Sequence, residues 1–343
     1  MNNKFKYILD KNLKKKIGFI KKKYTYSRFL KIYKSIKKKK ILVIGDPIID
    51  IYRYGNAVGT SSKSPSIAFL ENYVERYKGG SIAVAEMLSN LGFNVDLLIF
   101  KKKNTNLNIS SKINVITPFE ASSFPIIERF VDNSRNMVKL LQVYNLNKIK
   151  ITNQQEKAFI KKIQTIKSDF TLVIDFGFGL MTNEIIKKID ENIINYSLNC
   201  HLNSLNYISN YYDEYLNFNY LALNKREFEF SFREGKNFEE KIKIAKEKLN
   251  KNFAITLGEK GSIFIDKIHR CSFPAINKDI IDPVGCGDAF FSLSSLFNHF
   301  HGDPFLTNFV GNVYAGLHGN IVCNKEFSSE KYFLEVIKNI LNK

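Results

Sequence analysis

Residues 282–297 read DPVGCGDAFFSLSSLF, a glycine-bracketed turn that runs into an apolar stretch of helical character. Gly285 and Gly287 allow the backbone to turn tightly, so that the amide N–H groups of the turn can point together from the N-terminus of the helix. Such a cluster of N–H groups stabilises a phosphate or another anion. Asp288 lies in the first helical turn, where the helix dipole favours an ionised carboxylate that can accept the proton of a hydroxyl group. The segment predicts an anion-binding turn that includes Cys286, with Asp288 as the candidate general base.

The spacing of this segment leaves a second interpretation open. An ordinary glycine turn followed by a capping aspartate produces the same pattern and needs no catalytic function. The surrounding sequence therefore has to decide between the two interpretations.

Short apolar runs alternate with segments of helical length along the chain. ILVIGD, which begins at residue 41, is typical of a buried parallel strand whose C-terminal end reaches a loop. After Gly79 and Gly80, residues 82–91 carry apolar side chains at helical spacing. Further runs that end in a polar residue or glycine are VDLLIF (95–100), TLVIDFG (171–177), YLALN (220–224) and FAITLG (253–258). The alternation predicts an α/β fold with a doubly wound, mostly parallel sheet and helices on both faces.

The polar ends of these runs predict the position of a ligand site. Ligands of open α/β sheets bind beyond the carboxyl ends of the strands. We therefore expect Asp46, Asp175, Asn224 and Gly258 to face one crevice.

Two β-rich segments, approximately 50–76 and 125–146, interrupt the alternation. Their alternating polar and apolar residues predict hairpins that together form a small β-sheet. A small sheet over the crevice would act as a lid that keeps water from the reaction.

The composition indicates a globular protein of 343 residues with 44% hydrophobic content, which is enough for a large core. The four cysteines have no paired spacing, so the sequence favours neither a disulfide framework nor a zinc ribbon, and it suits a reducing cytoplasm. No apolar run approaches the length of a membrane-spanning helix. We expect a soluble, cytoplasmic protein.

The positive charge is concentrated at the N-terminus. Residues 1–40 hold sixteen Lys or Arg and one acid, so +15 of the +19 net charge belongs to this segment and +4 to the rest of the chain. We interpret residues 1–38 as a basic, linker-like arm and residues 39–343 as the main domain. A solvated helix or tail explains the arm best. Contact with anionic lipid or nucleic acid, or docking on a partner domain, remains open because charge attracts without specifying a partner.

These motifs occur in the order in which they occur in the PfkB, or ribokinase-like, carbohydrate kinases. Over roughly residues 40–343 the chain resembles most closely the kinase half of the bifunctional D-glycero-β-D-manno-heptose 7-phosphate kinase/nucleotidyltransferase (ADP-heptose synthase) proteins. In those proteins a basic linker joins the two halves, so we expect this chain to be the kinase half alone. The segments that carry the resemblance, besides the glycine turn, are IGDPIIDIYRYG, SSKSP, ERFVD, DFGFGLM and GNVYAGLHGNIVCN.

The resemblance implies roles for residues at the phosphate side of the crevice. Asp288 would deprotonate the acceptor hydroxyl, and the backbone of Gly285, Cys286 and Gly287 would form the anion hole. The TLGEKG and NxxE elements imply a nucleotide-binding set of Asn224, Glu227, Thr256, Gly258 and Gly261. Glu227 would hold Mg²⁺, directly or through water, and ATP would be the phosphoryl donor.

At the sugar side the resemblance implies that Asp46, Asp50, Gly79 and Gly80 contact the substrate. A basic side chain is also needed to hold the phosphate of the substrate itself. Lys63 and Arg129, in the segments expected to form the lid, are the candidates, and an ordinary surface position is the alternative for both.

The function implied is that of a phosphotransferase that acts on an alcohol group. The subgroup transfers the γ-phosphate of ATP to the anomeric hydroxyl of a heptose 7-phosphate, toward nucleotide-activated heptose for lipopolysaccharide. At three positions the sequence departs from the pattern of these relatives, and each departure bears on the implied function. Ala83 stands where many relatives have asparagine, the stretch after VDLLIF is shortened, and Cys286 replaces the commoner alanine.

Two other classes of function remain open. One is a catalytically weak pseudoenzyme that binds nucleotide or sugar as a scaffold for a separate nucleotidyltransferase. The other is a binding module that the basic arm attaches to nucleic acid or membrane. Lid strands in this family commonly pair between subunits, so we expect a homodimer, and we expect no specific nucleic-acid partner.

Overall fold

The structure is a computed structural model of the chain. It describes residues 11–102, 107–134, 137–145, 150–202, 212–277 and 279–342. The parts of the expected arm and lid segments at residues 1–10, 135–136 and 146 lie outside the described residues.

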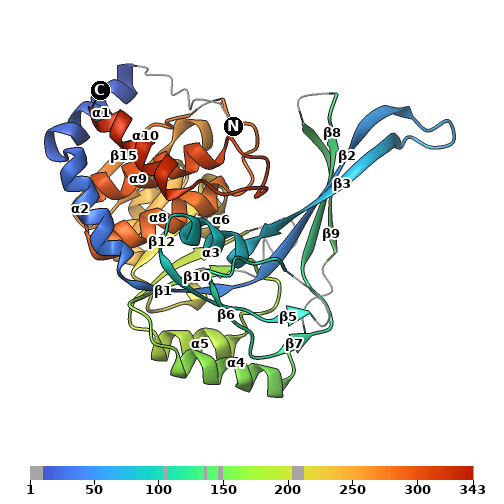
Figure 1. Ribbon diagram of the computed structural model, residues 1–343, viewed down its shortest axis with the longest axis horizontal. Helices are drawn as coiled ribbons and strands as arrows, with labels where there is room; N and C mark the ends of the chain where they lie inside the picture. The colour runs from blue at the N-terminus through green and yellow to red at the C-terminus, as the bar shows by residue number, and fades with distance from the viewer. Residues whose placement is uncertain are drawn as a thin grey trace.

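A large, mostly parallel sheet forms the centre of the molecule (Figure 1). Within the described residues it has nine strands, and β14 is antiparallel to both of its neighbours while all other neighbouring strands are parallel. Across the sheet the strands are β15 (Arg270–Phe273), β14 (Ser262–Ile265), β13 (Asn252–Thr256), β12 (Tyr220–Asn224), β11 (Tyr196–Cys200), β10 (Phe170–Asp175), β1 (Lys40–Gly45), β4 (Asn94–Leu98) and β6 (Asn114–Ile116). The predicted doubly wound α/β fold is confirmed.

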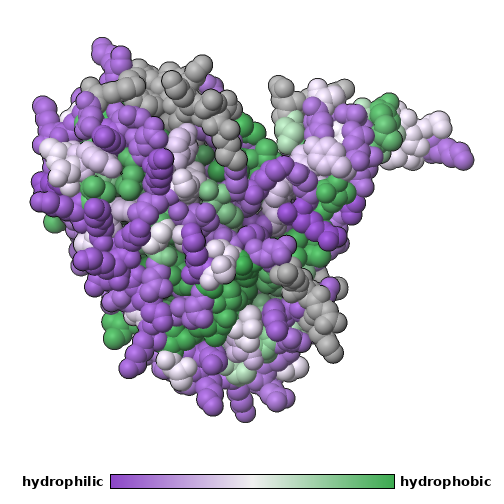
Figure 2. Space-filling view, viewed as in Figure 1, coloured by the Kyte–Doolittle hydropathy of each residue, from purple (hydrophilic) through white to green (hydrophobic). Residues whose placement is uncertain are grey.

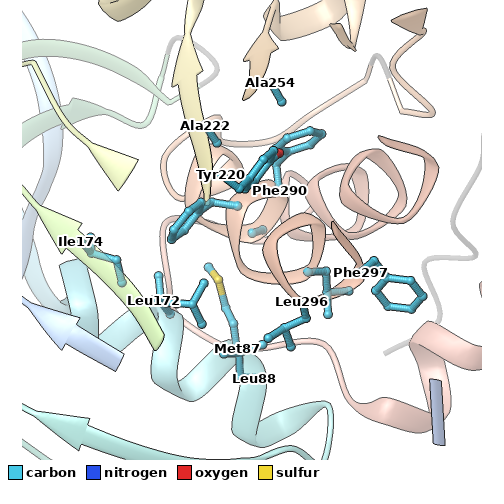
Figure 3. Packing of buried hydrophobic residues seen from close by; sticks show 14 of the residues in the cluster. Met87, Leu88, Leu172, Ile174, Tyr220, Ala222, Ala254, Phe290, Leu296 and Phe297 are labelled. Carbon is cyan, nitrogen blue, oxygen red and sulfur yellow. The ribbon is translucent and has the colours of Figure 1, made fainter. Parts of the chain in front are cut away.

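Helices cover both faces of this sheet. On one face α3 and α8 pack against the central strands, and Figure 3 shows Met87 and Phe290 among the side chains that meet there. Helices α4 and α5 lie together on the opposite side in Figure 1. The helices of the main body are α3 (Gly80–Asn90), α4 (Asn153–Thr165), α5 (Asn183–Asn192), α6 (Lys225–Ser231), α7 (Phe238–Leu249), α8 (Cys286–Phe300), α9 (Pro304–His318) and α10 (Glu330–Asn342). None of the helices in these ranges is long and apolar enough to cross a membrane.

A second sheet projects from the body (Figure 1). Its strands lie in the order β3 (Ile67–Gly79), β2 (Pro47–Thr60), β8 (Ile126–Asp132) and β9 (Val138–Asn145). Strand β2 pairs antiparallel with β3 and parallel with β8, which in turn pairs antiparallel with β9. The segments expected to form the lid thus contain these four strands, which we call the lid sheet. A short pair, β5 (Lys101–Lys102) and β7 (Glu120–Ala121), lies apart from it.

The basic N-terminal segment forms two helices, α1 (Lys11–Lys23) and α2 (Tyr26–Lys37). The buried residues of both helices belong to the same hydrophobic cluster as the central sheet: Leu13, Ile17, Ile20, Phe29, Tyr33 and Ile36. The Phe29 ring stacks on Phe297 with 5.8 Å between the ring centroids, and the Tyr33 hydroxyl donates to the Leu91 carbonyl at 2.5 Å.

The expectation of a solvated, linker-like arm is therefore wrong for the described part of the segment. The lysine runs conceal an apolar stripe at helical spacing, because an amphipathic helix can carry charge on one side and core residues on the other. Burial of that stripe fixes both helices on the body of the protein.

Candidate active site

The glycine turn lies between the loop that starts at Asp282 and helix α8. Gly285 is the residue that caps the helix, and its φ of +84° lies in the left-handed region that favours glycine. A Cβ atom at Gly285 would lie 2.5 Å from the Nε2 atom of His318 and 2.7 Å from the Oδ1 atom of Asn324. Backbone conformation and close packing therefore both require glycine at this position.

The first turn of α8 presents backbone N–H groups to solvent. Gly285 offers no side chain to cap the helix. Among the described residues, the N–H groups of Gly287 and Asp288 have no hydrogen-bond acceptor. The N–H groups at a helix N-terminus carry a partial positive charge, so the turn can bind an anion.

A cavity of about 510 Å³ opens in front of this turn. Its walls come from the lid sheet on one side, and from the ends of β12 and β13 and helices α8 and α9 on the other. The site residues predicted from the sequence that line it are Asp50, Gly80, Arg129, Asn224, Thr256, Gly258, Gly261, Gly285, Cys286, Gly287 and Asp288. The structure thus gathers residues from six separate stretches of sequence around one space.

The Asp288 carboxylate lies next to a histidine that the sequence analysis did not single out. The Nε2 atom of His201 is 3.2 Å from the Oδ1 atom of Asp288, and its Nδ1 atom is 3.3 Å from the Oε1 atom of Glu227. Burial lowers the pKa of His201, but its hydrogen bonds to Asp288 and Glu227 and the charges of these two carboxylates outweigh burial and raise the pKa to about 10. His201 is therefore an imidazolium ion at neutral pH.

The segments that follow β12 and β13 have closely packed backbones. Asn224 caps helix α6, and its side chain and that of Glu227 each accept the N–H of the other residue, at 2.9 and 2.7 Å. After β13, Gly258 and Gly261 have φ values of +59° and +89°. A Cβ atom at Gly261 would lie 2.0 Å from the Phe273 carbonyl oxygen, so Gly261 cannot be replaced by a larger residue without a shift of the backbone.

The lid side of the cavity carries a buried ion pair. Arg129 on β8 contacts the Asp50 carboxylate on β2, and both residues are buried. Burial raises the pKa of Asp50, while the charge of Arg129 and the hydrogen bond from it act in the opposite direction. A Cβ atom at Gly79 would lie 2.3 Å from the Oδ2 atom of Asp50, which explains why glycine stands beside this carboxylate.

Three of the predicted substrate contacts do not line the cavity: Gly79, which lies beside Asp50, Asp46 and Lys63. Asp46 is fully buried and is absent from the cavity wall. Its carboxylate accepts the N–H groups of Phe176 at 2.9 Å and of Phe178 and Leu180 at 3.4 Å. Burial and then the neighbouring Asp175 charge raise the pKa of Asp46. Lys63 is exposed in the turn between β2 and β3 and does not line the cavity of its own chain.

The residues at the cavity fit a magnesium ion that arrives with a nucleotide. The described residues contain no group of three or more His, Cys, Asp or Glu side chains that could hold a metal by themselves. Glu227 is buried behind the cavity wall, where it accepts the Asn224 N–H and lies beside His201. Mg²⁺ commonly keeps several water ligands and binds through one or two carboxylates plus substrate phosphates, so Glu227 suits contact through water.

Asp282 is a further buried carboxylate that joins the lid sheet to the glycine turn. It accepts hydrogen bonds from the Tyr52 hydroxyl on β2 at 2.8 Å and from the Lys139 ammonium on β9 at 2.7 Å. It also accepts the N–H groups of Val284 and Cys323, both at 3.0 Å. The loop that carries the turn is therefore fixed from both sides of the cavity.

Comparison with known proteins agrees with this arrangement. Residues 182–293 match the family model described as pfkB family carbohydrate kinase. The chain is 26% identical over 271 residues to the bifunctional protein HldE of Campylobacter concisus, and 25% identical over 267 residues to that of a Marinomonas species. These matches cover 74% and 75% of this chain and 55% of each relative, so the chain spans about half the length of the curated relatives that it matches.

Solved structures share the fold. The ribokinase of Thermotoga maritima has a TM-score of 0.66 at 15% sequence identity, and phosphofructokinase-2 of Escherichia coli has 0.69 at 12%. Each match covers 89% of this chain and 100% of the other chain. The chain therefore has a ribokinase-like fold, and residues 182–293 are similar to the carbohydrate kinases of the pfkB family.

Proposed function

We propose that the chain transfers the γ-phosphoryl group of ATP to a hydroxyl group of a phosphorylated sugar, with the anomeric hydroxyl of a heptose 7-phosphate as the acceptor. One observation carries the proposal. The Asp288 carboxylate and the N–H groups of the glycine turn line the same cavity of about 510 Å³. A proton acceptor and an anion-binding turn in one enclosed space are the two elements that phosphoryl transfer needs most.

In the proposed reaction Asp288 accepts the proton of the acceptor hydroxyl as the hydroxyl oxygen attacks the γ-phosphorus. The new O–P bond forms while the bond between the γ-phosphorus and the β–γ bridging oxygen breaks, and ADP leaves. The N–H groups of Gly287 and Asp288 stabilise the charge of the phosphoryl oxygens. Mg²⁺ would neutralise part of the charge on the phosphates, with Glu227 as its contact through water.

The two ends of the cavity suit the two substrates. Thr256, Gly258 and Gly261 line the end toward β13, where the two glycines would allow the nucleotide to approach the backbone. Asp50 and Arg129 line the end under the lid sheet, where they would bind the sugar and its phosphate. A bidentate guanidinium is well suited to a phosphate group.

The heptose assignment rests on the sequence motifs shared with heptose 7-phosphate kinases and on the HldE relatives. The product would then be activated by a separate nucleotidyltransferase, toward nucleotide-activated heptose for lipopolysaccharide. That enzyme is a proposed partner of this chain.

The test is ATP consumption with and without Mg²⁺, measured on heptose 7-phosphates, hexose phosphates and free sugars, with Asp288→Asn as the control. Turnover on a heptose phosphate that depends on Mg²⁺ and collapses in the variant supports the proposal. If no sugar is phosphorylated while ATP still binds, the chain acts as a scaffold and the proposal fails.

We also propose that the lid sheets of two copies pair to form a homodimer. The lid sheet carries exposed apolar side chains on three of its strands: Val58, Ile67, Leu70, Tyr73, Val74, Val138 and Leu141. Figure 2 shows hydrophobic side chains on the part of this sheet that projects from the body. Val58 is 62% and Leu70 57% exposed, and burial of such side chains against a second copy would remove them from water.

A further inference from the structure

His201 is held in a fixed position at the cavity. It follows strand β11, and its backbone N–H donates to the Asp175 carbonyl at 2.8 Å. Its ring stacks on the Phe176 ring, with 4.0 Å between the centroids and 12° between the planes. Both rings line the cavity. The backbone hydrogen bond and the ring stacking therefore fix the position and the orientation of the imidazole.

Each nitrogen of this imidazole faces a carboxylate. Nε2 lies 3.2 Å from Asp288 and Nδ1 lies 3.3 Å from Glu227. Ionised carboxylates accept hydrogen bonds and cannot donate them, so both ring nitrogens must carry a proton. The two contacts and the raised pKa of His201 both favour its charged form.

The charges around the cavity explain why a cation is needed at this point. Asp288 lines the cavity where the phosphates of ATP would bind, Glu227 lies behind His201, and like charges repel one another at close range. The described cavity wall also carries three other cations: Arg129, which is engaged by Asp50, Lys225, which lies 3.6 Å from Glu229, and Arg226. Among the described residues, His201 is the cation recorded in contact with Asp288.

We propose that His201 is a positioning residue that orients the Asp288 carboxylate toward the acceptor hydroxyl and places a positive charge beside the phosphoryl group in transit. This inference rests on the proposed function of Asp288 as the general base. The hydroxyl proton moves to Asp288, the electron pair of the broken P–O bond leaves on ADP, and His201 keeps both of its protons throughout. Its charge offsets that of the phosphoryl oxygens during transfer.

The test compares His201→Gln with His201→Lys. The glutamine variant removes the charge, and we expect kcat to fall roughly 100-fold with the KM for ATP changed less than about threefold. The lysine variant restores a cation, and we expect it to recover at least about tenfold of that loss. His269→Gln, at an exposed histidine beside Asp266 and away from the cavity, is the matched control and should retain wild-type turnover.

The outcomes separate the inference from the proposed function. If the wild-type chain turns over, Asp288→Asn collapses and His201→Gln retains kcat within about threefold, the role of His201 is wrong and that of Asp288 stands. A glutamine variant that loses ATP binding together with turnover, and is not rescued by lysine, also refutes the inference, because His201 would then only support the fold. If the wild-type chain phosphorylates no sugar, the proposed function itself fails.

Discussion

The Lys139 ammonium lies 2.7 Å from the Asp282 carboxylate, so strand β9 of the lid sheet is joined to the loop that carries the glycine turn. Asp282 is buried, and its ionised form needs all of its hydrogen-bond donors. Movement of the lid sheet would therefore also displace the turn where the phosphoryl group is proposed to bind. The first prediction follows from this contact.

Substitution Lys139→Met removes one donor from a buried carboxylate. We expect the free energy of unfolding to fall by about 1–3 kcal/mol, because the remaining charge is left with less compensation. The measurement is urea unfolding followed by circular dichroism. Lys139→Arg keeps a cation at the position and should restore most of the loss. Equal stability of the methionine variant and the wild type would show that the contact does not hold the lid.

Asp288→Asn tests the proposed base. We expect kcat to fall by roughly a thousandfold or more, because the amide neither accepts the hydroxyl proton nor keeps the charge that pairs with His201. ATP binding, measured by calorimetry, should persist. A variant with wild-type turnover would remove Asp288 from the mechanism.

Gly285 and Gly287 offer a matched pair of substitutions in the same turn. Gly285→Ala should destabilise the protein by about 2–4 kcal/mol, since its φ of +84° is strained for alanine and its Cβ would lie 2.5 Å from His318. A Cβ at Gly287 meets no atom within 4 Å, so Gly287→Ala should fold normally. Its methyl group would nevertheless enter the cavity and lower kcat.

Thermal unfolding and turnover of both alanine variants distinguish packing from phosphate binding. If Gly287→Ala retained full activity, no anion would bind against its backbone. If Gly285→Ala kept wild-type stability, the turn would have relaxed away from the observed conformation.

The pKa of His201, raised from 6.5 to about 10, predicts a dependence of stability on pH. A raised pKa means that the folded state binds the proton more tightly than the unfolded state. The contribution of His201 is then fully present below pH 6.5 and is lost as the pH rises to about 10. The difference in unfolding free energy between the wild type and His201→Gln should shrink over this range. A difference that stays constant from pH 6.5 to 10 would contradict the ion pairs with Asp288 and Glu227.

The proposed dimer predicts a response to charge on the lid sheet. Leu70→Glu places a carboxylate on the exposed apolar side chains and should shift the chain to monomers, because burying an unpaired charge is costly. Light scattering coupled to size-exclusion chromatography measures the change. Ile194→Glu, at an exposed apolar residue outside the lid sheet, is the control and should leave the mass unchanged. A wild-type chain of monomer mass would refute the dimer.

Much of the fold could be predicted from the sequence, because the sequence patterns that indicate its strands and helices are local. The apolar runs of β1, β10, β12 and β13 and the glycines before α8 each indicate one element with one conformation. The carboxyl-end rule then placed Asn224 and Gly258 at one cavity correctly, but Asp175 is buried outside the cavity wall, where it accepts the Tyr215 hydroxyl at 2.8 Å. The rule was wrong for Asp46, since a loop folded over the end of its strand and used the carboxylate to accept its own N–H groups.

His201 was missed for a different reason. Strand β11, Tyr196–Cys200, reads YSLNC, and its two polar residues break the apolar run that marks the other central strands. Ser197 and Asn199 are nevertheless buried within the sheet. Had this strand been recognised, the same rule would have placed His201 at the crevice. The contact with Glu227 depends on tertiary packing and has no signal in the sequence.

Helices α1 and α2 divide their residues into two sets that evolution can treat separately. Lys14, Lys15 and Lys22 face water, so these lysines can change, or be altered by design to change the isoelectric point, with little effect on the protein. Lys23 and Lys37 are different, because they form ion pairs with Asp303 and Glu330. Phe29 and Tyr33 are also constrained, because they form part of the seam that helix α8 shares with the N-terminal segment. A chain shortened to begin at residue 39 would expose that seam to water. Loss of the aromatic contacts would then change its behaviour in solution more than loss of the positive charge would.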